Sequence, residues 1–199
     1  MKSRYYAVMI LLCIVTIFSK STTANADDRY VKLCERYFTE FAEDYGKFGQ
    51  KDGFTYLYSD KKNTATIVAI PMEQKKVAVP EKINGKTVTK IELMDVFSCS
   101  SNYYFRDEFY GEHEDNPVPK VEYLSIPKTV KVINIYAGIG LTEGYCGELQ
   151  SYLVHLKKFN VASANKWYRS YKGMLYTKNG KKLLLVPRKY MAKTVKVKK

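Results

Sequence analysis

The chain has 199 residues, with 33 basic and 20 acidic side chains and a formal net charge of +13. This length allows one domain with a hydrophobic core, and the 18 tyrosines supply large, half-polar rings for strands or ligand-binding faces. The 4 cysteines and 2 histidines form no CxxC-type ligand set, which argues against a structural zinc site, and we expect no other metal and no cofactor.

The first 26 residues have the features of a signal peptide. Two basic residues precede a stretch over residues 5–18 that is almost entirely apolar but too short to span a bilayer comfortably. A small-x-small triplet over residues 24–26 predicts cleavage between Ala26 and Asp27. We therefore expect a protein that is secreted or at the cell surface, with no stable membrane insertion after cleavage. An uncleaved anchor is the alternative.

Residues 27–50 are predicted to form an N-terminal capping helix. Leu33, Tyr37, Phe41 and Tyr45 recur every four residues, which is the spacing of one helix face. A stack of repeated units needs such a cap, because an open end would expose its core.

Short apolar runs that end in proline recur in the rest of the chain, residues 51–199. Proline lacks a backbone donor and ends a strand ladder, so each run is predicted to be a short strand that stops at the same place. Recurrence over tens of residues is typical of stacked units. The three runs are Val77–Pro80, Leu124–Pro127 and Leu183–Pro187.

Turn signals separate the predicted strands. Two β-type runs over residues 53–58 and 64–70 flank a polar turn and predict a hairpin. Asn-Gly pairs at residues 84–85 and 179–180 predict two further tight turns. Residues 158–161 are predicted to begin another strand.

Two irregular segments, residues 98–119 and 138–152, interrupt the repeat and are predicted to be insertions. Cys99 and Cys146 lie in them 47 residues apart, the same spacing as the prolines that end the first two runs. Equivalent places in stacked units would bring the two thiols towards disulfide distance in an oxidising compartment. Buried cysteines that pack as small apolar side chains are the alternative.

Two blocks of residues carry a family resemblance. Residues 77–91 closely follow the pattern V-x-I-P-x-x-I-x-G-x-x-V-x-x-I, and Phe97 takes the place of the phenylalanine that comes after it. With the second block, the chain resembles the bacterial surface-antigen (BspA-like) type of leucine-rich repeat protein. The second block consists of Asn165, Tyr168, Gly173, Leu175, Tyr176, Leu184 and Pro187.

This resemblance covers residues 53–197 and implies an α+β repeat fold. The expected form is a short, irregular leucine-rich repeat solenoid with an N-terminal helical cap and β-hairpins. The family also implies extracellular recognition or adhesion without catalysis, and it supplies no catalytic residue. The chain departs from the family pattern in its two insertions and in lacking the Ala-Phe step of the second unit.

Two clusters of aromatic and basic residues are candidate binding sites. Loops on a rigid scaffold commonly carry recognition, and Tyr, Trp and Arg are favoured contact residues. The alternative is that these rings only cover irregular parts of the core. The first cluster, in the first insertion, consists of Tyr103, Tyr104, Phe105, Arg106, Phe109 and Tyr110. The second consists of Trp167, Arg169 and Tyr171, beside Tyr168 of the repeat framework.

Removal of residues 1–26, which hold three basic and no acidic side chains, leaves a net charge of +10. Such a charge can steer the protein to an anionic cell-wall or matrix polymer, or it can serve only to keep the surface solvated. The lysines are scattered along the chain in doublets, which favours the second interpretation. We expect no nucleic-acid partner, because an exported chain shows no recognised nucleic-acid motif.

Catalysis is not expected from this sequence. His113 lies in an acidic loop over residues 112–115 that we expect to be solvated, with a cation site as the alternative, and His155 is expected to be half-buried in a strand. We predict a secreted, non-catalytic leucine-rich repeat module for binding or adhesion that recognises a protein or glycan partner. The alternatives are a structural protein held at the wall by charge and a hydrolytic enzyme.

Overall fold

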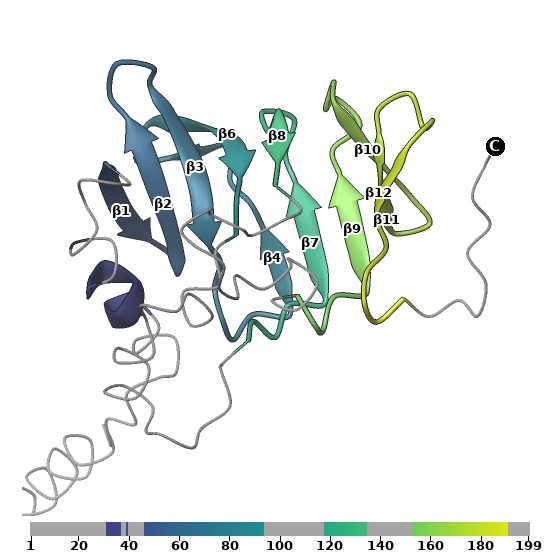
Figure 1. The fold of residues 1–199 in the computed structure, drawn as a ribbon, viewed down its shortest axis with the longest axis horizontal. Coiled ribbons are helices and arrows are strands. Elements are labelled where there is room, and N and C mark those ends of the chain that lie inside the picture. The colour runs from purple at the N-terminus through teal and green to yellow at the C-terminus, as the bar shows by residue number, and fades with distance from the viewer. Residues whose placement is uncertain (1–30, 37–38, 40–45, 94–117, 135–152, 191–199) are drawn as a thin grey trace, which may run out of the picture.

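The computed structural model describes residues 31–36, 39, 46–93, 118–134 and 153–190 (Figure 1). In this part of the chain, strands lie side by side in a long row and form three sheets. The strands are β1 Lys47–Lys51, β2 Phe54–Ser59, β3 Thr64–Ala69, β4 Lys76–Ala78, β5 Lys82–Ile83, β6 Lys86–Ile91, β7 Tyr123–Ile126, β8 Val132–Ile133, β9 Lys158–Val161, β10 Tyr168–Tyr171, β11 Met174–Thr177 and β12 Leu183–Leu185.

Antiparallel hairpins build the N-terminal part of the first sheet. Strand β1 pairs with β2, and β2 pairs with β3 so that Ser59 lies opposite Thr64. The turn between β2 and β3 contains Asn63 at a φ of 50°, a left-handed conformation that asparagine tolerates better than most residues. The hairpin predicted over residues 53–70 is therefore confirmed.

The second sheet is a parallel ladder that contains the first two repeated runs. Strands β4, β7 and β9 lie side by side, and Val77, Leu124 and Phe159 share one row across them. All three side chains are buried. Val77 and Leu124 are 47 residues apart, so the runs that end in Pro80 and Pro127 stack in register, as predicted.

Ion pairs outside the strands follow the same stacking. The Lys120 ammonium binds the Glu73 carboxylate at 2.5 Å, again across 47 residues. At the next step Lys157 donates to Glu122 at 2.8 Å, which lowers the pKa of the Glu122 carboxyl and raises the pKa of Lys157. Because these pairs are at the surface, each adds little to stability, but each is satisfied only in the observed register.

A second parallel ladder completes the first sheet. Strand β6 pairs with β3 on one side and with β8 on the other, while β5 folds back on β6. The turn between β5 and β6 is the predicted Asn-Gly turn: Asn84 has a φ of 44° and Gly85 a φ of 77°, as a type I′ turn requires.

One hydrophobic core joins all three sheets. The two ladders contribute their inward side chains, and the third sheet adds Leu175 and Leu185. Every row of the stack therefore buries apolar area against its neighbours, which is the main favourable term in folding. The largest fully buried side chains are Phe159, Leu33, Ile67, Ile70, Ile91, Leu93 and Ile126.

The third sheet, made of antiparallel β10, β11 and β12, covers the far edges of both ladders. At the edge of β9, the Val161 N–H donates to Ser170 Oγ at 3.2 Å. At the edge of β8, the Ile133 N–H donates to the Tyr168 hydroxyl at 3.1 Å. Side chains of the third sheet therefore accept hydrogen bonds from edge N–H groups that could otherwise pair with another strand.

The expected fold class is wrong. The described residues are mostly strands in three sheets of mixed pairing, and they do not close into a leucine-rich repeat solenoid. The third apolar-proline run shows why. Leu183–Leu185 is β12 and lies antiparallel to β11, while the third rung of the parallel ladder is β9. Apolar content alone could not distinguish a strand of the ladder from a strand of the sheet that covers it.

The predicted capping helix over residues 27–50 is also wrong. Within the described chain the helical residues are 31–36 and 39, and residues 47–51 form β1 instead. Gly46 adopts a φ of 77°, which is incompatible with a right-handed helix, and the next five residues pair along β2. Backbone pairing to β2 therefore makes a strand of residues 47–50, the last part of the predicted helix.

Several sequence predictions fall outside the described residues. They are the signal peptide with its cleavage site, nearly all of both insertions, the first aromatic cluster, Cys99 and Cys146. Within the part of the chain that the structure describes, no helix is long and apolar enough to cross a membrane.

Candidate binding face

Strand β10 places the second predicted cluster at the surface of the third sheet. Successive side chains of a strand point to opposite faces, so Arg169 and Tyr171 share the outer face while Tyr168 and Ser170 point the other way. Tyr171 is 43% exposed. We define the binding face by five residues of this end of the molecule: Lys131, Trp167, Arg169, Tyr171 and Lys172.

Asn165 fixes the start of β10. Its side chain is fully buried, and its Oδ1 accepts hydrogen bonds from the N–H groups of Trp167 at 2.9 Å and Tyr168 at 2.8 Å. Its Nδ2 donates to the carbonyls of Pro127 at 2.8 Å and Val130 at 2.9 Å. One amide therefore ties the backbone beneath the binding face to the second repeated unit.

Trp167 is held at the surface beside a cation. Its ring is 38% exposed, and Lys131 Nζ lies 5.5 Å from the ring centroid, within the range of a cation–π contact. The carbonyl of Trp167 accepts from the Lys178 N–H at 2.7 Å. The backbone of Trp167 is thus hydrogen-bonded through both its N–H and its carbonyl. The ring can therefore stack on a ligand with little further loss of backbone freedom.

Tyr171 lies between two cations at the tip of the β10–β11 hairpin. The Arg169 guanidinium is 6.0 Å and Lys172 Nζ is 5.6 Å from the Tyr171 ring centroid. The same ring meets Tyr176 edge-on, with centroids 6.3 Å apart and an interplanar angle of 74°. Aromatic pairs favour this edge-to-face geometry, so Tyr176 helps to hold the exposed Tyr171 ring in place.

Gly173 allows the hairpin tip to approach β9. It has a φ of 87°, and a Cβ at this position would lie 3.0 Å from Lys158 Cγ. Its carbonyl accepts from the Phe159 N–H at 2.8 Å, which ties the tip to the end of the parallel ladder. The position of Tyr171 therefore depends on a glycine two residues away.

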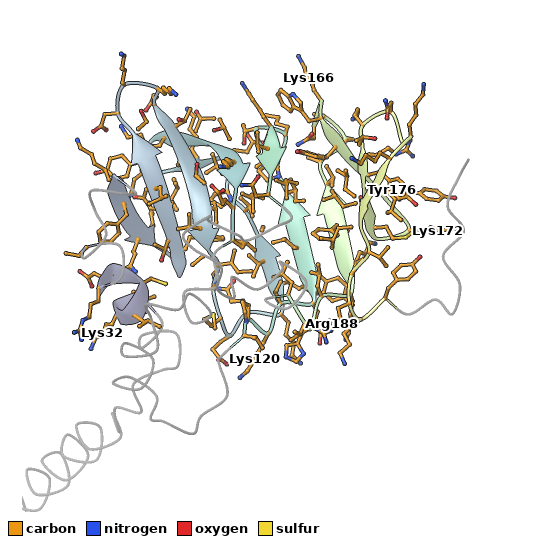
Figure 2. The ribbon with its side chains drawn as sticks, in the orientation of Figure 1. Lys32, Lys120, Lys166, Lys172, Tyr176 and Arg188 are labelled. Carbon is orange, nitrogen blue, oxygen red and sulfur yellow. The ribbon has the colours of Figure 1, made fainter. Side chains whose placement is uncertain are left out.

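The described segment that carries β9 and the third sheet, residues 153–190, has 10 Lys and Arg residues and no Asp or Glu. Residues 149–199 contain 14 Lys and Arg residues and no Asp or Glu, whereas the rest of the chain has 19 basic and 20 acidic residues. Figure 2 shows Lys166, Lys172 and Arg188 projecting from different sides of this end. The scatter of lysine doublets concealed this pattern, which appears only when the sign of the charge is followed along the chain.

Ten of these cations lie in the described segment over residues 153–190. One of them, Lys157, pairs with the carboxylate of Glu122. The others are exposed and have no acidic partner among the described residues. Their potentials add, because no carboxylate among the described residues pairs with them. The interpretation that the positive charge only keeps the surface solvated stays a prediction.

The remaining chemical candidates of the sequence are metal ligands and the two histidines. They contain no group of three or more His, Cys, Asp or Glu residues that could hold a metal ion. His155 is exposed in a turn, which corrects the prediction of a half-buried strand histidine. The acidic loop with His113 lies outside the described residues.

No known protein family and no curated protein matches this sequence. Among solved structures, the chain is similar to a leucine-rich repeat protein from Eubacterium ventriosum, with 22% identity and a TM-score of 0.33 over 59% of this chain and 22% of that chain. It is also similar to the pneumococcal vaccine antigen PcpA, with 15% identity and a TM-score of 0.23 over 72% of this chain and 57% of that chain. The chain spans less than two thirds of the length of either structure.

Proposed function

We propose that this protein is a secreted or cell-surface, non-catalytic recognition module that binds an anionic glycan through the binding face. The observation that carries the proposal is the segregation of charge: residues 149–199 hold 14 basic and no acidic side chains. A uniformly positive end attracts a polyanion from a distance and raises the rate of encounter. The predicted signal peptide and the BspA-like sequence motifs support the extracellular setting.

The contacts at the binding face suit a sugar chain that carries acidic groups. Trp167 and Tyr171 present ring faces at the surface, and Lys131, Arg169 and Lys172 stand within 6.0 Å of those ring centroids. A glycan can place its C–H surface on the rings and its carboxylate, sulfate or phosphate groups on the cations. Because the backbone beneath is already bonded, binding orders few groups and loses little of its free energy to entropy.

Replacement of both Trp167 and Tyr171 by alanine should weaken binding to heparin or to polygalacturonate by at least about tenfold. The substitution leaves every charge in place, so a loss of affinity reports the aromatic contacts. Affinity measured by calorimetry should also fall as salt rises, because screening weakens the field of the basic end. Lys51→Ala, which removes one exposed charge from β1, serves as the matched control and should bind like the wild type.

The other candidate functions predict different results in the same experiment. A structural protein held only by charge would bind the polyanions equally well with and without the two rings, and salt would release both forms. Equal affinity for duplex DNA and for the glycans would contradict recognition of a glycan. Binding to acidic proteins but to neither polysaccharide would also overturn the assignment.

A further inference from the structure

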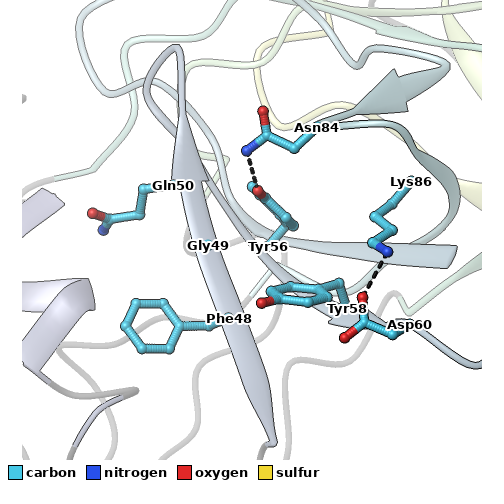
Figure 3. Close-up of a pocket in the computed structure, with 8 residues that line it drawn as sticks. All are labelled: Phe48, Gly49, Gln50, Tyr56, Tyr58, Asp60, Asn84 and Lys86. Atoms are coloured by element: carbon cyan, nitrogen blue, oxygen red, sulfur yellow. Dashed lines mark hydrogen bonds and ion pairs between the residues drawn. The ribbon is translucent and has the colours of Figure 1, made fainter. Parts of the chain in front are cut away.

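A hollow of about 330 Å³ lies at the opposite end of the row of strands from the binding face (Figures 1 and 3). It is formed by β1, β2 and the turn between β5 and β6. The side chains that matter for its chemistry are those of Tyr56, Tyr58, Asp60, Asn84 and Lys86. Binding pockets for small ligands usually have volumes of about 300–1,000 Å³, so this hollow suits one small ring.

A glycine on β1 keeps the hollow open. Tyr56 is buried, with 3% of its surface exposed, and its ring passes directly beside Gly49. A Cβ at Gly49 would lie 2.5 Å from the Tyr56 hydroxyl oxygen, closer than real Cβ contacts allow. Any larger residue would displace the tyrosine, so the glycine places a phenol hydroxyl in the hollow.

The Asn-Gly turn positions a second polar group. Asn84 sits in the left-handed region at a φ of 44°, and its Nδ2 donates to the Tyr56 hydroxyl at 2.5 Å. The hydroxyl oxygen thus accepts from the amide and keeps its own proton to donate. Asn84 Oδ1 is a second acceptor at the rim, on a residue that is exposed.

A carboxylate with two lysines forms the opposite side of the hollow. Asp60 accepts from Lys86 at 2.6 Å and from Lys47 at 2.8 Å, and these bonds lower the pKa of Asp60 to about 2. The carboxylate is therefore ionised at any physiological pH and has lone pairs left for further donors. Lys86 Nζ also lies 5.8 Å from the Tyr58 ring centroid, so a positive charge lies next to the Tyr58 ring.

We propose that this hollow binds one ring of a neutral hexopyranose sugar. The hollow brings together an aromatic face, a carboxylate, an ammonium, an amide and a phenol hydroxyl. A polyhydroxylated ring can contact all five groups. Its C–H face would pack on Tyr58, and its hydroxyls would donate to Asp60 and accept from Lys86. Lys47 and Lys86 are already paired with Asp60, so the cluster needs no charged ligand to neutralise it, and the polar lining disfavours an apolar molecule.

Titration of the isotope-labelled protein with methyl glycosides of glucose, galactose and N-acetylglucosamine tests this site. We expect at least one sugar to shift the NMR signals of residues 48–50, 56–60 and 84–86 together. Asp60→Asn keeps the shape of the side chain and removes the charged acceptor. It should therefore lower the affinity for that sugar by about tenfold. The matched control is Asp52→Asn, the same change at the other end of β2 and outside the hollow.

Gly49→Ala provides a second test, because its Cβ would push the Tyr56 hydroxyl out of its place in the hollow without touching Asp60. It should abolish the sugar-induced shifts while the spectrum elsewhere stays folded. The proposal is overturned if no sugar produces these shifts, or if Asp60→Asn binds as well as Asp52→Asn. The Trp167→Ala/Tyr171→Ala variant should bind the sugar normally. If no sugar binds in the hollow while the protein still binds polyanions, the sugar site is wrong and the proposed function still stands.

Discussion

Asn165→Ala is expected to destabilise the fold by about 3–5 kcal/mol, which is among the largest effects that one substitution produces. The reason is that the side chain is fully buried and makes four hydrogen bonds to backbone groups on two segments. Alanine would leave one buried carbonyl, one part-buried carbonyl and two part-buried N–H groups without these partners. Urea denaturation followed by circular dichroism measures the loss of unfolding free energy.

An exposed asparagine provides the control for this prediction. Asn179 Oδ1 likewise accepts two hydrogen bonds, from the Thr177 hydroxyl at 2.8 Å and from the Lys181 N–H at 3.0 Å, but Asn179 lies at the surface of a turn. Asn179→Ala should cost less than about 1 kcal/mol, because water replaces the lost partners. Equal effects of the two substitutions would contradict the role given to Asn165 as the tie between β10 and the second unit.

Phe159→Ala should also cost about 3–5 kcal/mol, through a different mechanism. Phe159 is 1% exposed and stands in the row formed with Val77 and Leu124, at the rung that joins the parallel ladder to the third sheet. Truncation removes apolar contacts and leaves a cavity that a three-sheet junction cannot easily close. Thermal and urea unfolding should show a cooperative transition at lower temperature and lower denaturant concentration.

Trp167→Ala is the matched surface change for Phe159→Ala. Trp167 is also a large aromatic residue, but it is 38% exposed, so its removal should change stability by no more than about 0.5 kcal/mol. The contrast separates burial from residue type. A loss for Phe159→Ala as small as that for Trp167→Ala would show that β9 is not the third rung of the core.

Local signals were sufficient to predict part of the fold. The turns at residues 84–85 and 179–180 depend on the left-handed freedom of Asn84, Gly85 and Gly180, which is a property of those residues alone. The spacing of 47 residues between the first two runs likewise predicted the register between β4 and β7, because stacked units repeat their buried rows. Where chemistry is local or periodic, sequence and structure agree.

Long-range pairing decided the elements that were predicted wrongly. Residues 47–51 follow a stretch with helical spacing, yet they become β1 because β2 offers them a full set of backbone partners. Leu183–Leu185 is as apolar as a ladder strand, yet it joins β11 and leaves the ladder to β9. Neither choice can be inferred without knowing which edges are free in three dimensions.

The two candidate sites differ in the same way. Trp167, Arg169 and Tyr171 follow the alternation of one strand, so the sequence predicted them together. The hollow with Tyr56, Asp60 and Asn84 draws on two separate hairpins and on the missing side chain of Gly49. The sequence showed the turn at Asn84, but it did not show that the Asn84 side chain would bond to Tyr56.

Hydroxyl-radical footprinting with heparin is the most direct test of the central claim, that the aromatic and basic end of the molecule recognises an anionic glycan. Both Trp167 and Tyr171 are exposed and readily oxidised in the free protein, and bound polymer should protect them several-fold. Oxidation of Tyr58, at the far end of the row of strands, should not change. Bound heparin that leaves Trp167 and Tyr171 as reactive as in the free protein would contradict the account.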